Sequence, residues 1–152
     1  NKLEEEARHK IEEAVKTAKE DIKRQAEAED LFLQGRSHHL NKEYDKAEEY
    51  YNKALETGHT HALNNLGALY YHQRNYEKAK EYYDKALERG DNRALRNLGI
   101  LYIEQKEYEK AEEYFKKAID TGDNNALNNL RILYTEQNEH TKLEELNQKY
   151  KI

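Results

Sequence analysis

The sequence predicts an all-α fold, a right-handed α-solenoid of antiparallel helix pairs preceded by one amphipathic helix. Three segments align without gaps at a step of 32 residues, and the 152-residue chain contains no Pro. Within each segment the apolar residues recur at steps of three and four, the spacing of one helix face. Repeats of this length form helical hairpins that bury a continuous core only when they stack. We therefore expect about nine helices and no strand.

Three sets of equivalent residues define the 32-residue repeat. They are Ala47, Ala79 and Ala111; Tyr44, Tyr76 and Tyr108; and Gly35, Gly67 and Gly99. In the second repeat the apolar pattern predicts a first helix over about 61–72 and a second over 76–87, joined by a short polar turn. Gly58, Gly90 and Gly122 follow the second helices. Gly there supplies the left-handed geometry that ends a helix, and the Asp or Asn that follows can cap the next one.

The three glycines of the repeat lie in the middle of predicted helices, where Gly costs about 1 kcal/mol relative to Ala. We expect a neighbouring helix to approach closely at Gly35, Gly67 and Gly99. The small Ala at 47, 79 and 111 and the large Tyr at 51 and 83 suggest the same knob-and-hole packing.

Residues 1–27 lie outside the repeat and are predicted to form a separate segment, with about four repeats over 28–152. Their apolar stripe indicates an amphipathic helix and consists of Leu3, Ala7, Ile11, Ala14, Val15, Ala18 and Ile22. Two paths are open for this helix. It continues into the first repeat helix as a rod of close to forty residues, or it bends near Asp30 and folds back to cap the solenoid.

Composition excludes several classes of function. The 26 Lys and Arg are interleaved with 31 Asp and Glu, giving a net charge of −5, whereas nucleic-acid binding needs clustered cationic charge. No apolar run is long enough to span a membrane, and the first residues lack the apolar core of a signal peptide. We expect a soluble, cytoplasm-compatible monomer with no targeting signal.

No group of residues indicates catalysis, a cofactor or a metal. The chain has no Cys. Its paired histidines, His38-His39 and His59-Thr60-His61, fall about one helix length apart, too far to converge on one zinc ion. The carboxylates alternate with Lys on exposed faces, where nothing shifts their pKa towards acid–base work. Ser37 is the single Ser, and its His neighbours in sequence point elsewhere on a helix. We expect no enzyme activity.

The repeat resembles the tetratricopeptide repeat and the related Sel1-like repeat. The matching residues in the second repeat are Leu66, Gly67, Tyr70, Ala79, Tyr83 and Ala86. The repeat is two residues shorter than the usual tetratricopeptide period and lacks the Pro that commonly closes it. His38 stands for the signature Tyr in the first repeat, and Arg131 stands for Gly in the last. Terminal repeats are expected to differ, because they present a polar outer face.

The resemblance implies a concave groove lined by the first helix of each pair, whose polar residues hold an extended peptide. Carried over to this chain, the lining comprises Arg36, His39, Asn64, Ala68, Tyr71, Arg93, Arg96, Asn97, Asn128 and Asn129. Asn side chains can donate to and accept from a peptide backbone. The arginines can make forked contacts with a carboxylate, so an acidic peptide or a free C-terminus is the expected ligand.

Two functions remain open from the sequence. The chain also lacks Met and Trp, and the omission of helix breakers and oxidisable residues is typical of engineered proteins. Our first expectation is a non-catalytic helical scaffold, engineered and without an evolved ligand. The alternative is a protein–protein interaction module that binds an extended acidic peptide or a C-terminus in its concave groove.

Overall fold

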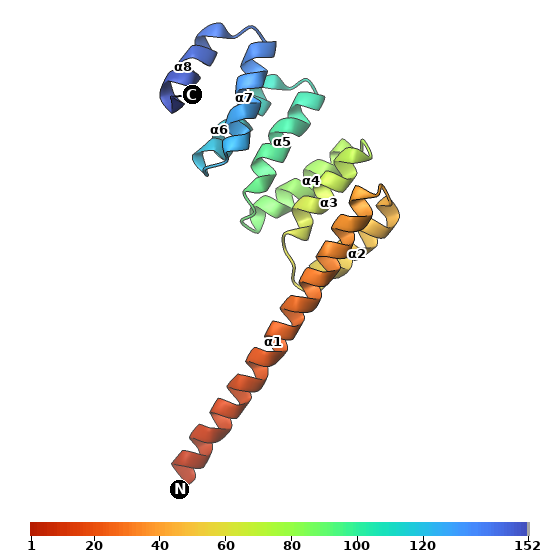
Figure 1. Cartoon of the computed structure of the whole chain (residues 1–152), viewed down its shortest axis with the longest axis vertical. Coiled ribbons are helices and arrows are strands. Elements are labelled where there is room, and N and C mark those ends of the chain that lie inside the picture. Colours follow the sequence, from red (N-terminus) through yellow and green to blue (C-terminus); the bar gives the residue numbers. More distant parts are fainter. Residues whose placement is uncertain (152) are drawn as a thin grey trace. The chain divides into compact units, whose positions relative to one another are not determined.

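A computed structural model of the chain describes residues 1–151, which form eight helices and no strand. The helices are α1 (Lys2–Leu40), α2 (Tyr44–Glu56), α3 (Ala62–His72), α4 (Tyr76–Glu88), α5 (Arg93–Glu104), α6 (Tyr108–Asp120), α7 (Asn124–Glu136) and α8 (His140–Tyr150) (Figure 1). Backbone contacts divide the chain into two compact units. The N-terminal unit is Asn1–Asn65, and the C-terminal unit starts at Leu66, within α3.

The helix α1 is continuous over 39 residues. This settles the path left open by the sequence: the chain does not bend near Asp30, and the N-terminal segment runs straight into the first repeat helix. The expectation of about nine helices is therefore wrong, since eight are present in residues 1–151. The physical reason is that residues 25–30 contain neither Gly nor Pro, so nothing interrupts the backbone hydrogen bonds there.

The N-terminal unit has its core at the C-terminal end of α1, where α2 packs against it. Phe32 of α1 is buried, and its ring lies 5.9 Å from the Tyr51 ring and 4.1 Å from the His59 ring, stacked on the latter. His59 Nε2 also lies 2.7 Å from a carboxylate oxygen of Glu29. These contacts fix the α2–α3 connection against α1.

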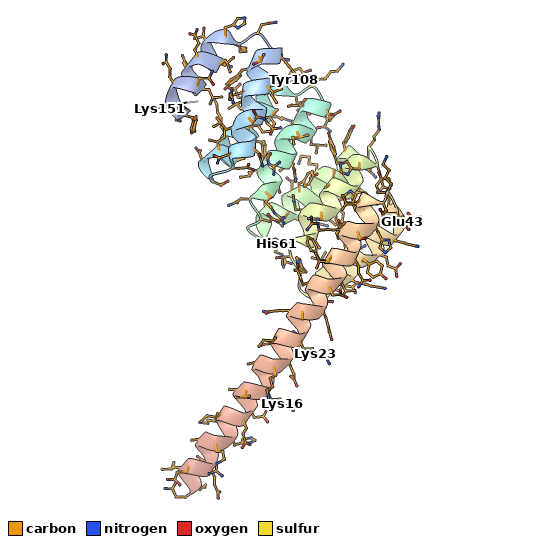
Figure 2. All side chains as sticks on the ribbon, in the orientation of Figure 1. Lys16, Lys23, Glu43, His61, Tyr108 and Lys151 are labelled. Atoms are coloured by element: carbon orange, nitrogen blue, oxygen red, sulfur yellow. The ribbon has the colours of Figure 1, made fainter. Side chains whose placement is uncertain are left out.

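Residues 1–27 are exposed to solvent throughout. Leu3, Ile11 and Ile22 of the apolar stripe are each more than 60% exposed. Figure 2 shows Lys16 and Lys23 on this part of α1. Lys23 lines a hollow together with Glu56 at the end of α2. The structure thus shows an extension and no fold-back. The predicted boundary between residues 27 and 28 stays a prediction.

In the first three helix pairs a glycine of the first helix lies under an aromatic ring of the second. A Cβ built on Gly35 would lie 2.6 Å from the Tyr51 ring, and one on Gly67 would lie 2.5 Å from the Tyr83 ring. On Gly99 it would lie 2.5 Å from Phe115. These distances are shorter than any carbon–carbon contact allows. The expected close approach is confirmed, and the hole for each aromatic knob is a glycine of the preceding helix.

The turns repeat with the helices. Gly58, Gly90 and Gly122 have φ between +83° and +106°, as expected for the residue that follows a second helix. The amide after each glycine donates to the carbonyl five residues earlier, as in the bond from Asp91 to Ala86, 3.0 Å long. This is the Schellman geometry that ends a helix. Asp123 then caps α7 by accepting from the amides of Asn125 and Ala126.

Candidate functional site

The sequence-predicted groove residues fall in both units, and the two sets are described separately. Arg36, His39 and Asn64 belong to the N-terminal unit. Arg36 is exposed, whereas Asn64 is 7% exposed and so belongs to the interior. His39 Nδ1 lies 3.2 Å from the Tyr51 hydroxyl, which also accepts from the Asn65 amide at 3.4 Å. The Tyr51 hydroxyl can accept from the Asn65 amide and still bond to His39, because its oxygen has two lone pairs and one proton.

In the C-terminal unit, two hydrogen bonds join successive first helices. The Nε of Arg96 on α5 donates to Asp123 at the start of α7, at 2.8 Å. The hydroxyl of Tyr71 on α3 donates to Glu104 at the end of α5, at 3.2 Å. Both bonds link residues of the predicted groove lining to the neighbouring first helix. The face formed by α5 and α7, here called the first-helix face, is therefore held in register by its own side chains.

Arg93 makes a forked contact with a carboxylate of the chain itself. Its Nε and Nη2 donate to the two oxygens of Asp91, at 2.9 and 2.7 Å. Hydrogen bonding to Asp91 raises the pKa of Arg93 further above its usual value. The Asp91 side chain is 7% exposed, while that of Arg93 is 45% exposed. The outer edge of the guanidinium thus remains in solvent, with donors beyond the two it uses.

Tyr71 is less available to a peptide ligand than the sequence indicates. Its ring lies 5.7 Å from that of Tyr76, in addition to its hydrogen bond to Glu104. Burial, followed by the nearby Glu104 carboxylate, raises the pKa of Tyr71 to about 12. The hydroxyl is therefore a neutral donor at physiological pH, and it acts as a clamp between α3 and α5.

The remaining predicted residues sit on the first-helix face with varied exposure. Asn128 is exposed, and Asn97 and Asn129 are half-buried. Sequence reasoning missed the apolar side chains among them. Ile100 and Ile103 on α5 are half-buried, and Ile132 on α7 is 48% exposed. The signal was present: Ile100 and Ile132 follow Arg36 and Ala68 at the 32-residue step, so they occupy groove positions already assigned. The face therefore combines amide donors and acceptors with exposed apolar surface.

A second polar cluster, also missed by sequence reasoning, joins α6, α7 and α8. A Glu112 oxygen accepts from the Tyr134 hydroxyl at 2.7 Å and lies 3.0 Å from Lys116 Nζ. Lys142 Nζ lies 3.3 Å from the other oxygen. Burial raises the pKa of Glu112, but the bonds from Tyr134 and the two lysines outweigh it and leave that pKa below its usual value. We call these four residues the Glu112 cluster.

Residues 1–151 offer neither a metal site nor a membrane-spanning helix. No group of three or more His, Asp or Glu in that range is placed to hold a metal ion. No helix in the same range is both long and apolar enough to cross a membrane.

Models of the tetratricopeptide repeat match the chain over residues 28–57 and 60–123. A comparison with curated proteins finds no match.

Solved structures share the fold. BtubC (BKLC) from P. vanneervenii is 21% identical with a TM-score of 0.69, over 82% of this chain and 61% of its own. PilF from Pseudomonas aeruginosa is 25% identical with a TM-score of 0.68, over 80% of this chain and 58% of its own. The TPR2AB domain of yeast Sti1, solved as a complex with pHSP90, is 25% identical with a TM-score of 0.69. That match covers 75% of this chain and 48% of the Sti1 chain.

This chain thus spans between about half and three-fifths of the length of those three. The stacked helix pairs, the glycine–aromatic contacts and the family matches agree. The protein is a tetratricopeptide-like helical repeat protein, with an all-α solenoid fold.

Proposed function

We propose that the chain is a non-catalytic protein-interaction module whose first-helix face binds an extended peptide. The observation that carries the proposal is the mixture of half-buried Asn129 with exposed Asn128 and Ile132 on α7. Asn amides can pair with the backbone of an extended chain, which has unpaired donors and acceptors on both edges. Half-exposed Ile side chains add apolar contact between those bonds. A peptide complex of the similar Sti1 domain supports the same use of the fold.

The hydrogen bonds of Arg93 and Arg96 to aspartates limit the charge expected on the peptide ligand. Arg96 is hydrogen-bonded to Asp123, and Arg93 to Asp91. The charge of each arginine is therefore already paired with a carboxylate of the chain. Each guanidinium has five N–H donors, and the 45% exposed Arg93 can add a ligand carboxylate at its outer edge. We therefore propose a peptide with apolar side chains for the Ile surface and one carboxylate, either acidic or C-terminal.

A peptide titration tests this function. Fluorescence anisotropy would follow labelled ten-residue peptides of apolar and amide residues, with a free or an amidated C-terminus. We expect micromolar to millimolar binding, weaker for the amidated form. Binding should fall about tenfold in Asn129→Ala/Ile132→Ala, a loss of about 1.4 kcal/mol. The matched control, Gln148→Ala on α8, should bind normally, because Gln148 is exposed and lies outside the first-helix face.

The outcome separates the two functions that the sequence leaves open. Equal binding by the double variant and the parent would contradict the assignment of the face. Failure of every peptide to bind would contradict the module and favour a helical scaffold without a ligand, of engineered origin. Circular dichroism of each variant would confirm that the helices remain formed.

A further inference from the structure

Two helix pairs of the C-terminal unit carry equivalent pairs of tyrosine rings, which are stacked in one pair and tilted by 42° in the other. The rings of Tyr70 and Tyr82 lie 5.3 Å apart, and so do those of Tyr102 and Tyr114. In each case the first ring belongs to a first helix and the second ring to the second helix of the same pair. The second ring therefore fills the space beside the first.

A lysine lies over each ring of both tyrosine pairs. Lys78 Nζ lies 5.1 Å from the centre of the Tyr70 ring, and Lys85 Nζ lies 4.9 Å from that of Tyr82. Lys110 and Lys117 cover Tyr102 and Tyr114 in the same way, at 5.5 and 4.8 Å. Such contacts attract because the ring face is electron-rich.

The last pair keeps half of this arrangement. Tyr134 follows Tyr102 at the 32-residue step, and Lys142 lies over its ring at 5.8 Å. The residue that follows Tyr114 at that step is Leu146, which has no ring. A hollow of about 420 Å³ is present there. It is lined by Tyr134, Leu146, Ile119, Lys149, Tyr150 and members of the Glu112 cluster. We call it the Leu146 hollow.

The charges around the Leu146 hollow balance. Lys116, Lys142 and Lys149 face Glu112, Asp120 and Glu145. The Glu112 carboxylate already accepts from Tyr134 and lies within 3.3 Å of two lysines, so it does not need a cationic ligand. The volume of the Leu146 hollow falls in the range of ligand sites, about 300–1,000 Å³. A neutral ligand with an apolar body is the chemistry that this lining accepts without leaving a charge unpaired.

We propose that the Leu146 hollow binds a tyrosine side chain of a partner protein, which takes the place that Tyr82 and Tyr114 fill in the preceding pairs. The ring packs against Leu146 and Ile119, and the ammonium groups of Lys142 and Lys149 contact its face as Lys117 contacts Tyr114. The phenol hydroxyl meets the polar rim of carboxylates and lysines. The hollow is lined from α6 and α8 and by Tyr134 of α7, and its proposed use does not depend on the peptide-binding function of the first-helix face.

The test uses N-acetyl-tyrosinamide as the probe and the full chain labelled with ¹⁵N. We expect saturable shifts of backbone amides in α8 and the C-terminal half of α6, with a dissociation constant in the millimolar range. N-acetyl-leucinamide, which has the same peptide groups and no ring, should bind about tenfold more weakly. Equal affinity for the two amides, or shifts centred on α5 and α7, would overturn the proposal.

Two variants sharpen the result. Leu146→Tyr supplies the missing ring from the chain itself and should raise the thermal midpoint while abolishing the binding of N-acetyl-tyrosinamide. If Leu146→Tyr fails to fold, Lys142→Met provides the test. It removes one ammonium group and should weaken the binding of N-acetyl-tyrosinamide severalfold. Lys46→Met on α2 is the control and should leave binding unchanged. Undiminished binding by folded Leu146→Tyr, or by Lys142→Met, contradicts the site.

Discussion

The third helix pair and the last one differ in which helix carries the larger residue at the contact between the two helices of the pair. In the third pair, Gly99 on the first helix lies under the Phe115 ring of the second. At the equivalent positions of the last pair, 32 residues on, the chain has Arg131 and Asn147. The large residue has moved to the first helix and the smaller one to the second.

The exchange has a cost in hydrogen bonding. The Nε of Arg131 and the Oδ1 of Asn147 are buried, and neither has a partner among the described residues. An unpaired buried polar atom costs about 1–3 kcal/mol. The comparison teaches that the last pair is held less by core packing and more by the Glu112 cluster, which ties α8 to α6 and α7.

Filling the glycine hole tests the packing of the third pair directly. Gly99→Ala places a methyl group 2.5 Å from Phe115, and overpacking of this kind costs about 1–3 kcal/mol. Ala also gains about 1 kcal/mol of helix propensity, so we expect a net loss of up to about 2 kcal/mol, read from the midpoint of urea unfolding. Arg131→Ala is the control, since the residue equivalent to Phe115 in that pair is Asn147, and it should change stability by less. A Gly99→Ala protein as stable as the parent would show that Phe115 can move aside.

Removing the charge of the Glu112 cluster comes next. Glu112→Gln weakens three interactions at once, and hydrogen bonds to charged groups contribute about 1.5–3 kcal/mol in total here. The folded-state pKa of Glu112 lies below its ordinary value of 4.5. The stabilisation is therefore fully present above pH 4.5 and is lost as the pH falls through the lowered pKa.

We accordingly expect the difference in stability between parent and Glu112→Gln to be large at pH 7 and to vanish in acid. Unfolding by urea at a series of pH values would measure it. Glu113→Gln is the matched control, because Glu113 is exposed and pairs with Lys117 at 3.0 Å. A difference that does not change with pH would contradict the role of the charged carboxylate.

The size exchange itself predicts a coupling. Arg131→Gly alone removes a half-buried side chain, and Asn147→Tyr alone is expected to force a ring against Arg131. Together they rebuild the glycine–aromatic contact of the third pair. We expect the double variant to be more stable than the sum of the single changes by about 0.5–2 kcal/mol. Strict additivity would mean that these two positions do not meet as Gly99 and Phe115 do.

The smallest effect is expected in the exposed part of α1. Ile11→Ala should change unfolding stability by less than about 0.5 kcal/mol, because Ile11 is 64% exposed and packs against nothing that would be lost. Phe32→Ala on the same helix is the contrast, with a cost of about 3–5 kcal/mol, since Phe32 is 7% exposed and contacts two rings. A large loss in Ile11→Ala would indicate that this stripe is covered in solution.

Much of the fold could be predicted because it depends on local signals that recur. Gly90 followed by Asp91 ends one helix and starts the next, whatever lies around it. The three- and four-residue spacing of apolar residues identified the buried faces, and Leu66, Leu98 and Leu130 are indeed fully buried. The mid-helix glycines predicted close helix–helix contacts, because Gly is unfavourable in the middle of a helix.

The candidate site was harder to predict, since hydrogen-bond partners far apart in sequence leave no periodic trace. Arg96 and Asp123 are separated by 27 residues, and only the stacking of α5 beside α7 makes them partners. The same holds for Glu112 and Lys142. Residue type suggested that Arg96 would hold a ligand carboxylate, whereas the fold supplies a carboxylate of its own.

The sequence by itself therefore determined the helices, their ends and the face that each one buries, because these follow from propensity and spacing within one or two turns. Only the tertiary structure decided which ring fills which glycine hole, which guanidinium is already paired, and that the last pair contains a hollow at Leu146. Those features depend on the distances between side chains of different helices. Packing sets these distances, and a list of residues does not contain them.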